Sequence, residues 1–510
     1  MLFKSLLRCF PLSKSKSNLT TVLSGNSKIK FDMASLSTLS VDETSCFCEA
    51  EKFVEFVNDS PSPFHAVHNV KKTLLKNGFK ELSEKNSWDD SLKPNGRYYF
   101  TRNGSTIVAF AIGGKYQPGN GINLIGAHTD SPVLKVRLKP VSLKKGSGYL
   151  KVGVQTYGGG LWHTWFDRDL SVAGVVMVES EGRFTQTLVR IDEPILRIPN
   201  LAIHLDRNIN DGFKFNNETQ LVPILATVEK AISETEDVKV GEEASSDASL
   251  NHHPILLRKI AKTLKIQVSQ IRDFELCLYD TQPSTIGGIC KEFIFSPRLD
   301  NLNSSYCAIE ALVRSTKSSD SLSSEDRIWM AALFDNEEIG SRSAYGADSS
   351  LLDNTIRRLQ SNGSHTSFEQ TVANSFLVSA DMAHAIHPNY PEKHEEDHAP
   401  AINKGMVIKI NANQRYATTS VTSTMFKTIA KNHGLPIQVF VVRNDVPCGS
   451  TIGPLISSNL GIRTIDVGNP MLSMHSIRET MGTDDVSSAI NIFKAFYTDF
   501  SELDSKFKVD

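Results

Sequence analysis

The chain has 510 residues, of which 40% are hydrophobic and 22% are charged, and its formal net charge is −2. This composition is typical of a globular protein, and the length allows about two or three domains. The charge balance gives no sign of a nucleic-acid-binding surface, and no apolar run approaches the roughly 20 residues that a membrane-spanning helix needs. The seven cysteines match no disulfide or zinc-knuckle spacing, so we expect reduced thiols.

The first 45 residues differ from the rest of the chain. Six lysines and arginines precede the first acidic residue, Asp32, and serine and threonine are abundant. A basic, serine-rich and acid-poor N-terminus is typical of a transit peptide, which predicts a chloroplast or a mitochondrion as the destination. A disordered tail is the alternative, and Met33 could be an internal start that gives a cytoplasmic form.

After this extension the pattern predicts the first part of an α/β domain, over residues 46–131. Helical spacing of apolar residues favours one helix near 41–58 and another near 65–82. Residues 97–112 alternate in the manner of strands, and residues 122–127 form a short apolar run.

Residues 132–290 have a different texture. Runs rich in β-branched residues are broken by Gly and Pro from Val133 to about Leu225, which predicts a β-rich insert. Residues 228–254 are polar and predict a loop. His252 and His253 lie there, and we expect solvated side chains rather than metal ligands.

Alternation of strands and helices returns for the second part of the α/β domain, over residues 291–510. Residues 302–314 predict an amphipathic helix, with Asp300 and Asn301 where an N-cap would lie. A loop is expected at 318–326. Further strands are expected at 406–410, 438–443 and 463–467, and a closing helix at 487–500.

Five segments place a His, Asp or Glu after or close to an apolar run. They are INLIGAHTD (122–130), PRLDN (297–301), IWMAALFDNEEIG (328–340), SFLVSADMAH (375–384) and IRTIDVGNPMLSMH (462–475). Ligands of open α/β sheets bind beyond the carboxyl ends of the strands. We therefore expect the polar residues to cluster at one edge of one sheet: His128, Asp130, Glu337, Glu338 and Asp381.

Such a cluster has the donors of a hydrolytic two-metal site. Two divalent ions held by His and carboxylate groups, one of them bridging, can bind and acidify a single water. A donor set of this kind without cysteine suits an open catalytic zinc site, and Mn²⁺ or Co²⁺ would also be tolerated. Of the adjacent Glu337 and Glu338, one could bind metal while the other acts as general base; a solvated acidic turn is the alternative.

The sequence resembles the aspartyl aminopeptidases, a family of dinuclear zinc exopeptidases. The resemblance runs from about Phe53 to about Tyr497 and is carried by seven motifs in the family's order. They are AHTDSP, SPRLDNL, LFDNEEIGS, SADMAHAIHPNYPEKHE, IKINANQRYAT, GSTIGP and MHSIRE. It implies a three-layer α/β/α zinc-peptidase catalytic domain with an inserted β-rich oligomerisation domain.

The resemblance also implies a role for each matching residue. His128 and Asp381 would bind one of two zinc ions per subunit, Glu338 and His475 the other, and Asp300 would bridge them. Glu337 would be the general base, and Asp130 would support His128. Substrate contacts are implied for Glu337, Asp381, His384, Lys409 and Tyr416, and for His204 from a neighbouring subunit.

The implied activity is the removal of N-terminal Asp or Glu from peptides, in a homo-oligomer that is a dodecamer built from dimers. Lys409 would pair with the acidic side chain of the substrate. The rival hypotheses are a two-metal aminopeptidase of broader specificity and a non-enzymatic assembly that acts as scaffold or cargo. The complete ligand set argues against the second rival as the sole role.

Overall fold

The computed structural model describes residues 43–136, 144–236, 252–317 and 322–508. The predicted transit peptide lies outside these residues except for its last three positions, which begin a helix. No helix of the described part is long and apolar enough to cross a membrane.

A nine-stranded sheet forms the centre of the α/β part, counted within the described residues. Its order is β1-β2-β3-β15-β4-β16-β20-β18-β19. The strands are β1 Lys80–Glu81, β2 Arg97–Arg102, β3 Thr106–Ile112, β4 Ile122–His128, β15 Ile328–Phe334, β16 Phe376–Ala380, β18 Met406–Ile410, β19 Ile437–Val441 and β20 Arg463–Gly468. Strands β15, β4, β16 and β20 run parallel to one another. Each of the first three is buried along its whole length, as parallel strands covered on both faces require.

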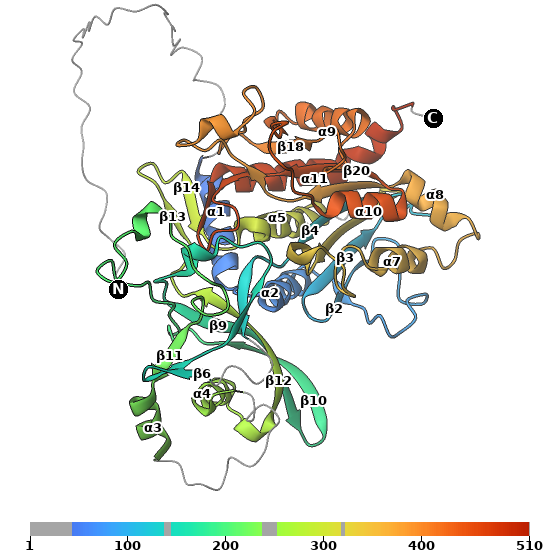
Figure 1. Cartoon of the computed structure of the whole chain (residues 1–510). Coiled ribbons are helices and arrows are strands. Elements are labelled where there is room, and N and C mark those ends of the chain that lie inside the picture. Colours follow the sequence, from blue (N-terminus) through green and yellow to red (C-terminus); the bar gives the residue numbers. More distant parts are fainter. Residues whose placement is uncertain (1–42, 137–143, 237–251, 318–321, 509–510) are drawn as a thin grey trace, which may run out of the picture. The chain divides into compact units, whose positions relative to one another are not determined.

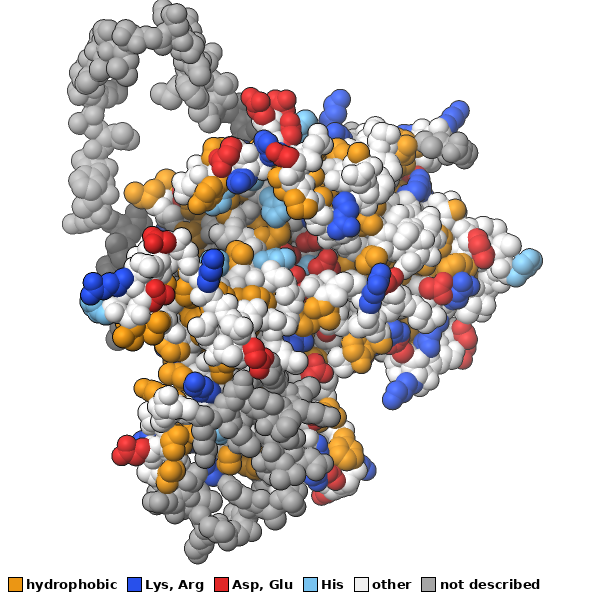
Figure 2. Space-filling view, viewed as in Figure 1, with side chains coloured by type: hydrophobic (Ala, Val, Ile, Leu, Met, Phe, Trp, Pro, Cys, Tyr) orange, Lys and Arg blue, Asp and Glu red, His pale blue; other side chains and the backbone are white. Residues whose placement is uncertain are grey.

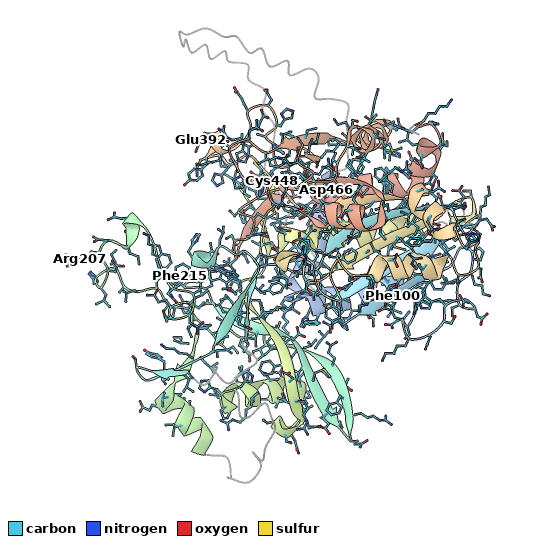
Figure 3. All side chains as sticks on the ribbon, turned by 45° about the vertical axis from the view of Figure 1, so that its right-hand side comes forward. Phe100, Arg207, Phe215, Glu392, Cys448 and Asp466 are labelled. Carbon is cyan, nitrogen blue, oxygen red and sulfur yellow. The ribbon has the colours of Figure 1, made fainter. Side chains whose placement is uncertain are left out.

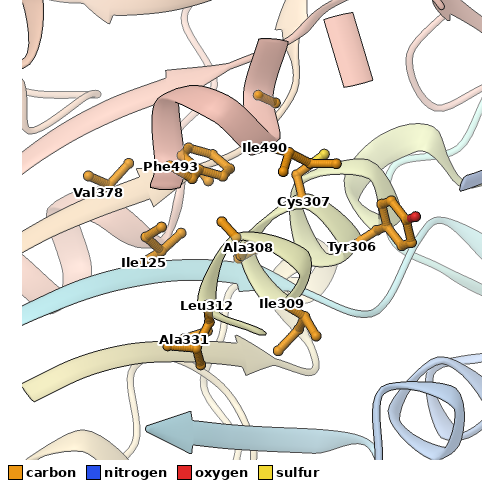
Figure 4. Packing of buried hydrophobic residues seen from close by; sticks show 14 of the residues in the cluster. Ile125, Tyr306, Cys307, Ala308, Ile309, Leu312, Ala331, Val378, Ile490 and Phe493 are labelled. Atoms are coloured by element: carbon orange, nitrogen blue, oxygen red, sulfur yellow. The ribbon is translucent and has the colours of Figure 1, made fainter. Parts of the chain in front are cut away.

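Helices cover both faces of this sheet, which makes the α/β part a three-layer structure (Figure 1). The helices are α1 Glu43–Asn58, α2 Pro63–Lys76, α5 Leu299–Ser315, α9 Ser420–Asn432 and α11 Asp484–Asp504 on one face, and α7 Leu351–Leu359, α8 Ser367–Asn374 and α10 Ile452–Leu460 on the other. In Figure 4, Ala308 and Leu312 of α5 and Phe493 of α11 pack over the strand residues Ile125 and Val378. Burial of these side chains contributes roughly 25 cal/mol per Å² of apolar surface.

The insert forms two sheets of its own, with strand orders β10-β9-β12-β5-β8 and β11-β7-β6. Its strands are β5 Val133–Val136, β6 Lys144–Gly146, β7 Tyr149–Lys151, β8 Val154–Tyr157, β9 Leu170–Ser180, β10 Arg183–Arg190, β11 Ile224–Thr227 and β12 Ile271–Asp280. Helix α4 (Pro254–Leu264) packs Leu257 and Ile260 into a core separate from those of the large sheet. The insert therefore has its own hydrophobic core.

A fourth sheet, of order β13-β14-β22-β21-β17, connects several loops of the site. Its strands are short: β13 Thr285–Gly287, β14 Phe293–Ser296, β17 Ala383–His384, β21 Pro470–Leu472 and β22 Glu479–Gly482. The loop between β21 and β22 carries His475, and His384 lies on β17 itself. This sheet therefore holds together the segments near residues 285–296, 383–384 and 470–482.

Several predicted boundaries were wrong. The helix expected at 65–82 ends at Lys76, because Gly78 takes a left-handed φ of 80° that ends a helix. The strand pattern over residues 97–112 corresponds to a hairpin of two strands, β2 and β3, with Asn103 and Gly104 at positive φ in its turn. Strand β19 begins one residue before the expected 438 and ends at Val441.

Two further expectations need correction near the loops and the helix start. Residues 228–236 of the expected polar loop form helix α3, Val228–Glu236, and residues 237–251 lie outside the described part. The N-cap position of α5 is Arg298, which makes no side-chain capping bond, and Asp300 and Asn301 follow it as a non-helical interruption of the first turn. Of the loop expected at 318–326, residues 318–321 lie outside the described part.

Candidate metal centre

Three parallel strands end at one edge of the large sheet and deliver the predicted polar residues there. His128 is the last residue of β4, the 3₁₀ turn Glu337–Ile339 follows β15 after two residues, and Asp381 follows β16 directly. Asp300 comes from the start of α5 and His475 from the β21–β22 loop. In the face shown in Figure 2, histidine and acidic side chains gather near the middle.

His128 is fixed so that its Nε2 atom faces the carboxylates. Its Nδ1 lies 3.0 Å from the Asp130 carbonyl oxygen and 3.3 Å from Asp130 Oδ1, so Nδ1 is the protonated nitrogen of the neutral ring. Nε2 then lies 3.3 Å from Asp300 Oδ1 and 3.8 Å from Asp381 Oδ1. Asp130 orients a ligand in the way that carboxylates orient metal-bound histidines.

His475 is held in the same manner on the other side of Asp300. Its Nδ1 donates to the Gly159 carbonyl oxygen over 3.1 Å. Its Nε2 lies 3.4 Å from Glu338 Oε2 and 3.5 Å from Asp300 Oδ2. The two oxygens of Asp300 therefore face two different groups of donors.

The donor atoms form two overlapping triads, His128–Asp300–Asp381 and Asp300–Glu338–His475, in each of which they lie within 4.8 Å of one another. Both triads fit zinc, which takes imidazole nitrogen and carboxylate oxygen. Asp300 Oδ1 and Glu338 Oε1 are buried without a hydrogen-bond donor among the described residues. Buried carboxylate oxygens without a hydrogen-bond donor are stabilised by a bound cation or by a proton, and the neighbouring histidine nitrogens make a metal ion fit this position.

The charges of the site shift several pKa values in the protein without metal. Burial acts to lower the pKa of His128, but the carboxylates of Glu337, Asp130, Asp300 and Asp381 outweigh it and raise that pKa well above its usual value. Burial raises the pKa of Glu337 to about 8, with Asp381 and Asp300 adding to the shift and His128 opposing it. Without metal the Glu337 carboxyl is therefore largely protonated at pH 7, and cations bound beside it would favour the carboxylate that a general base needs.

Glu337 and Glu338 differ in what they face. Glu337 Oε2 lies 3.8 Å from His128 Nε2, and its side chain is 16% exposed. Glu338 is 4% exposed and lies against His475. A third group, His128–Glu337–Glu338, also brings donor atoms within 4.8 Å of one another, so proximity alone does not assign the two roles.

The predicted substrate-binding residues of the α/β part lie beside the Asp381 end of the cluster. Lys409, on β18, is 3% exposed, and its Nζ lies 3.9 Å from Asp381 Oδ2 and 5.4 Å from the centre of the Tyr416 ring. His384 and Tyr416 both line a pocket of about 270 Å³. His384 is exposed at the end of β17, so its ring is open to this pocket.

His204 is the predicted site residue that the structure does not bring to the cluster. It is exposed, on a loop of the insert that also carries the exposed Leu201, Ile203 and Leu205. Figure 3 labels Arg207, three residues after His204, and Asp466, which lies on β20 of the large sheet. The two are well apart in that view. Within one chain His204 is not a member of the site.

Sequence reasoning missed three buried groups that support the site. Glu479 accepts hydrogen bonds from the backbone nitrogens of Asp300 (3.2 Å) and His475 (2.8 Å). Asp466 accepts from the Ala417 nitrogen over 2.6 Å and so holds the residue after Tyr416. Tyr157 donates to Asp130 over 2.7 Å. Glu479 lies in the MHSIRE motif, which was the only available signal for it.

The expectation for His252 and His253 was wrong. Both are 3% exposed, not solvated. The His252 ring packs against Phe274 with 4.4 Å between ring centres, and His253 Nε2 lies 3.2 Å from the Lys151 carbonyl oxygen. Neither belongs to a group of potential metal ligands within the described residues. They stabilise the core of the insert.

Comparisons with known proteins agree with this geometry. A family model described as aminopeptidase I zinc metalloprotease (M18) matches residues 56–497. The chain is 53% identical over 487 residues to an aspartyl aminopeptidase of Aspergillus oryzae, which covers 90% of this chain and 97% of that protein. It is 54% identical over 477 residues to a probable aspartyl aminopeptidase of Ricinus communis, which covers 90% of this chain and 96% of that protein.

Solved structures resemble the whole described fold. A cryo-EM structure of the Ape4 and Nbr1 complex matches with a TM-score of 0.87 and 48% identity, over 92% of this chain and 89% of that one. A structure of the S. cerevisiae mApe1 dodecamer matches with a TM-score of 0.80 and 32% identity, over 91% of this chain and 100% of that one. The three-layer domain and its β-rich insert are thus a known architecture.

Proposed function

The chain belongs to the M18 family of aminopeptidase I zinc metalloproteases and is a metal-dependent aminopeptidase, and on that premise we propose that it removes N-terminal Asp and Glu from peptides with two zinc ions. The observation that carries the proposal is the position of Asp300, whose two oxygens face His128 on one side and His475 on the other. The names of the relatives support the acidic specificity.

We assign one zinc ion to His128, Asp381 and Asp300, and the other to Glu338, His475 and Asp300. A pair of such ions supplies a water of lowered pKa and stabilises the charge that develops on the attacked carbonyl oxygen. The buried acceptors Asp300 Oδ1 and Glu338 Oε1 support this assignment.

The chain's own residues supply the proton transfers and the selectivity. Glu337 accepts the proton of the attacking water and returns it to the leaving amine. Asp130 keeps Nδ1 of His128 protonated, so that Nε2 faces the metal position. Lys409, beside His384 and Tyr416, is the cation for the acidic side chain of the substrate, and its burial strengthens the ion pair.

The surroundings of the site lead to three further assignments. Residues 46–131 and 291–510 form the catalytic domain, and residues 132–290 form a dimerisation domain; the separate sheets and core of the insert support this division. His204 of the partner subunit completes the site, which its exposure in the single chain supports. The whole protein self-associates, and a structural relative is described as a dodecamer.

We also propose that residues 1–45 direct the protein to an organelle. A fluorescent fusion of these residues should enter chloroplasts or mitochondria, whereas a form that starts at Met33 should remain in the cytoplasm. Cytoplasmic fluorescence of the longer fusion would contradict the assignment.

A substrate panel tests the proposed function. Zinc-loaded protein should hydrolyse Asp- and Glu-aminoacyl-coumarins at least tenfold faster than the Leu and Ala compounds, and a chelator should abolish all four rates. Equal rates on all four would indicate an aminopeptidase of broader specificity. Absence of turnover in protein that holds zinc would favour a scaffold.

A further inference from the structure

A short segment of the insert contacts two parts of the metal cluster: Asp130, beside His128, and the loop that carries His475. Residues 157–164 connect the end of β8 to the 3₁₀ turn η1, Trp162–Trp165, and we call them the strap. The cluster residues that the strap contacts follow β4, follow β15 or lie in the β21–β22 loop, all in the α/β part.

Tyr157 begins the strap and bonds to Asp130, the residue that orients His128. Its hydroxyl donates to Asp130 Oδ2 over 2.7 Å and accepts from Asn336 Nδ2 over 2.9 Å. Asp130 also accepts from the backbone nitrogens of Glu337 and Glu338, each over 3.1 Å. One buried carboxylate therefore orients His128 and both glutamates, and the Tyr157 hydroxyl fixes that carboxylate.

The residues after Tyr157 bond to His475 and to its loop. The Gly159 carbonyl oxygen accepts from His475 Nδ1 over 3.1 Å, which leaves Nε2 free to bind metal. The nitrogen of Leu161 donates to the His475 carbonyl oxygen over 2.9 Å, and Thr164 Oγ1 accepts from the Ile477 nitrogen over 3.0 Å. Side chain and backbone of His475 are therefore bonded to the same strap.

Gly158 lies directly against Glu338, the metal ligand beside His475. Its φ is 78°, and a Cβ atom there would lie 3.1 Å from Cβ and 3.4 Å from the carbonyl oxygen of Glu338. Contacts of 3.1 Å are tighter than ordinary van der Waals packing, so Glu338 would have to move. A side chain at this position would strain the backbone, as at any residue of such φ, and would in addition press on the metal ligand Glu338.

We propose that the strap positions metal ligands, with Tyr157 acting through Asp130 on His128 and Glu338, and with Gly158 and Gly159 acting on Glu338 and His475; the inference rests on the proposed function. The metal centre is then built jointly by the insert and the catalytic sheet. Loss of such outer contacts typically lowers metal affinity by about 10- to 100-fold.

The first test uses Gly158→Ala in the full chain, with Gly182→Ala as a matched control. Gly182 has a similar φ of 73° in the β9–β10 hairpin, but a Cβ atom there meets nothing within 4 Å. After equilibration at limiting zinc, Gly158→Ala should retain about one zinc ion per chain, whereas the wild type and Gly182→Ala retain two. Equal retention in all three proteins would overturn the proposal.

The second test removes only a hydroxyl. Tyr157→Phe should weaken zinc binding by about tenfold or more and change the visible spectrum of the cobalt-substituted protein, without a large change in melting temperature. The control Tyr279→Phe removes a buried hydroxyl of the insert that donates to the Ile191 carbonyl oxygen over 2.7 Å, and it should change neither metal property.

Metal content of the wild type and of the variants separates the role of the strap from the proposed function. A wild-type protein that binds fewer than two zinc ions would overturn the proposed function and the strap with it. A wild type with two ions and Tyr157→Phe and Gly158→Ala variants that bind metal as it does would overturn the strap alone.

Discussion

Residues of the metal cluster such as His128 are buried, whereas His204 lies on an exposed loop of the insert. His128, Asp300 and Asp381 lie at strand ends or a helix start and are almost fully buried, with their orientations fixed inside one chain. His204 is exposed among apolar side chains such as Leu205, which is 74% exposed. Apolar surface of this kind on a loop is typical of an interface with another protein.

The difference shows which part of the activity one subunit can supply. Metal binding and proton transfer depend on contacts within the chain, so variants in the cluster should have large effects that do not depend on assembly. A role for His204 depends on a second subunit, so its variants should have smaller effects that disappear when subunits are separated.

The largest effect is expected for Asp300→Ala. The change removes the carboxylate shared by both triads, so both zinc ions should be lost and turnover should fall by about 10⁴-fold or more. Metal content by atomic emission and turnover of Asp-coumarin measure it. Normal zinc content in a folded Asp300→Ala protein would contradict the dinuclear site.

Glu337→Gln should separate proton transfer from metal binding. The amide cannot accept the water's proton, so turnover should fall by about 10²–10⁴-fold while both zinc ions remain. The matched variant Glu338→Gln should instead lose zinc. Identical metal content and rates in the two variants would refute the division of roles.

Lys409→Met should change specificity. Loss of one partner of a buried ion pair costs about 3–5 kcal/mol, so Asp and Glu substrates should be hydrolysed at least a hundredfold more slowly. The rate on a Leu substrate should change little. Lys427→Met, at an exposed position of α9, is the control. An unchanged Asp/Leu preference would exclude Lys409 as the counter-ion.

We propose that His204 of the partner subunit donates a hydrogen bond to the developing oxyanion, so His204→Ala should lower turnover by about a hundredfold. If His204 acts across subunits, mixing His204→Ala with Glu337→Gln subunits should give hybrids with one complete site. Action within one chain would leave a defect in every site, so it could not give rescue. Confirmed mixed oligomers that remain inactive would contradict the cross-subunit role.

The smallest effect is a pH dependence of the metal-free protein. Burial raises the folded-state pKa of Glu337 and of Glu479 to about 8, from 4.5. Although burial opposes it, the bond to Asp300 and the charge of Glu338 raise the pKa of His475 to about 10, from 6.5. In all three cases the folded state binds more protons than the unfolded state between pH 6.5 and 8.

Stability of the metal-free protein should therefore fall as pH rises through this window. Buried histidines with lowered pKa values, such as His65 at about 4, oppose the trend only near pH 6.5, where the unfolded ring is half protonated, and their effect fades as the pH rises toward 8. Melting temperatures at pH 6.5 and 8 measure it, and excess zinc should abolish the decrease. A higher melting temperature of metal-free protein at pH 8 would contradict the prediction.

The sequence predicted the site best where local pattern and strand direction coincide. Apolar runs that stop at His128, at Asp335 and at Asp381 predict three parallel strand ends, and the structure brings them to one edge. His475 lies in a loop at a φ of 67°, three residues after β21, so no strand end marks it, and the segment 462–475 and the family motif indicated it.

Contacts between distant segments could not be predicted in this way. Tyr157 and Glu479 act through hydrogen bonds to residues far away or on another strand, and no periodicity encodes those bonds. His252 and His253 were misjudged because a polar stretch of sequence does not reveal that His252 packs against Phe274 and His253 against the Lys151 backbone. Tertiary packing, not local composition, decides such positions.

Anomalous diffraction at the zinc edge from crystals of the zinc-loaded protein tests the central claim most directly. The account predicts two peaks per chain about 3.5–4 Å apart, one beside His128 and Asp381 and the other beside Glu338 and His475, with Asp300 between them. A single peak, or peaks away from Asp300, would contradict it.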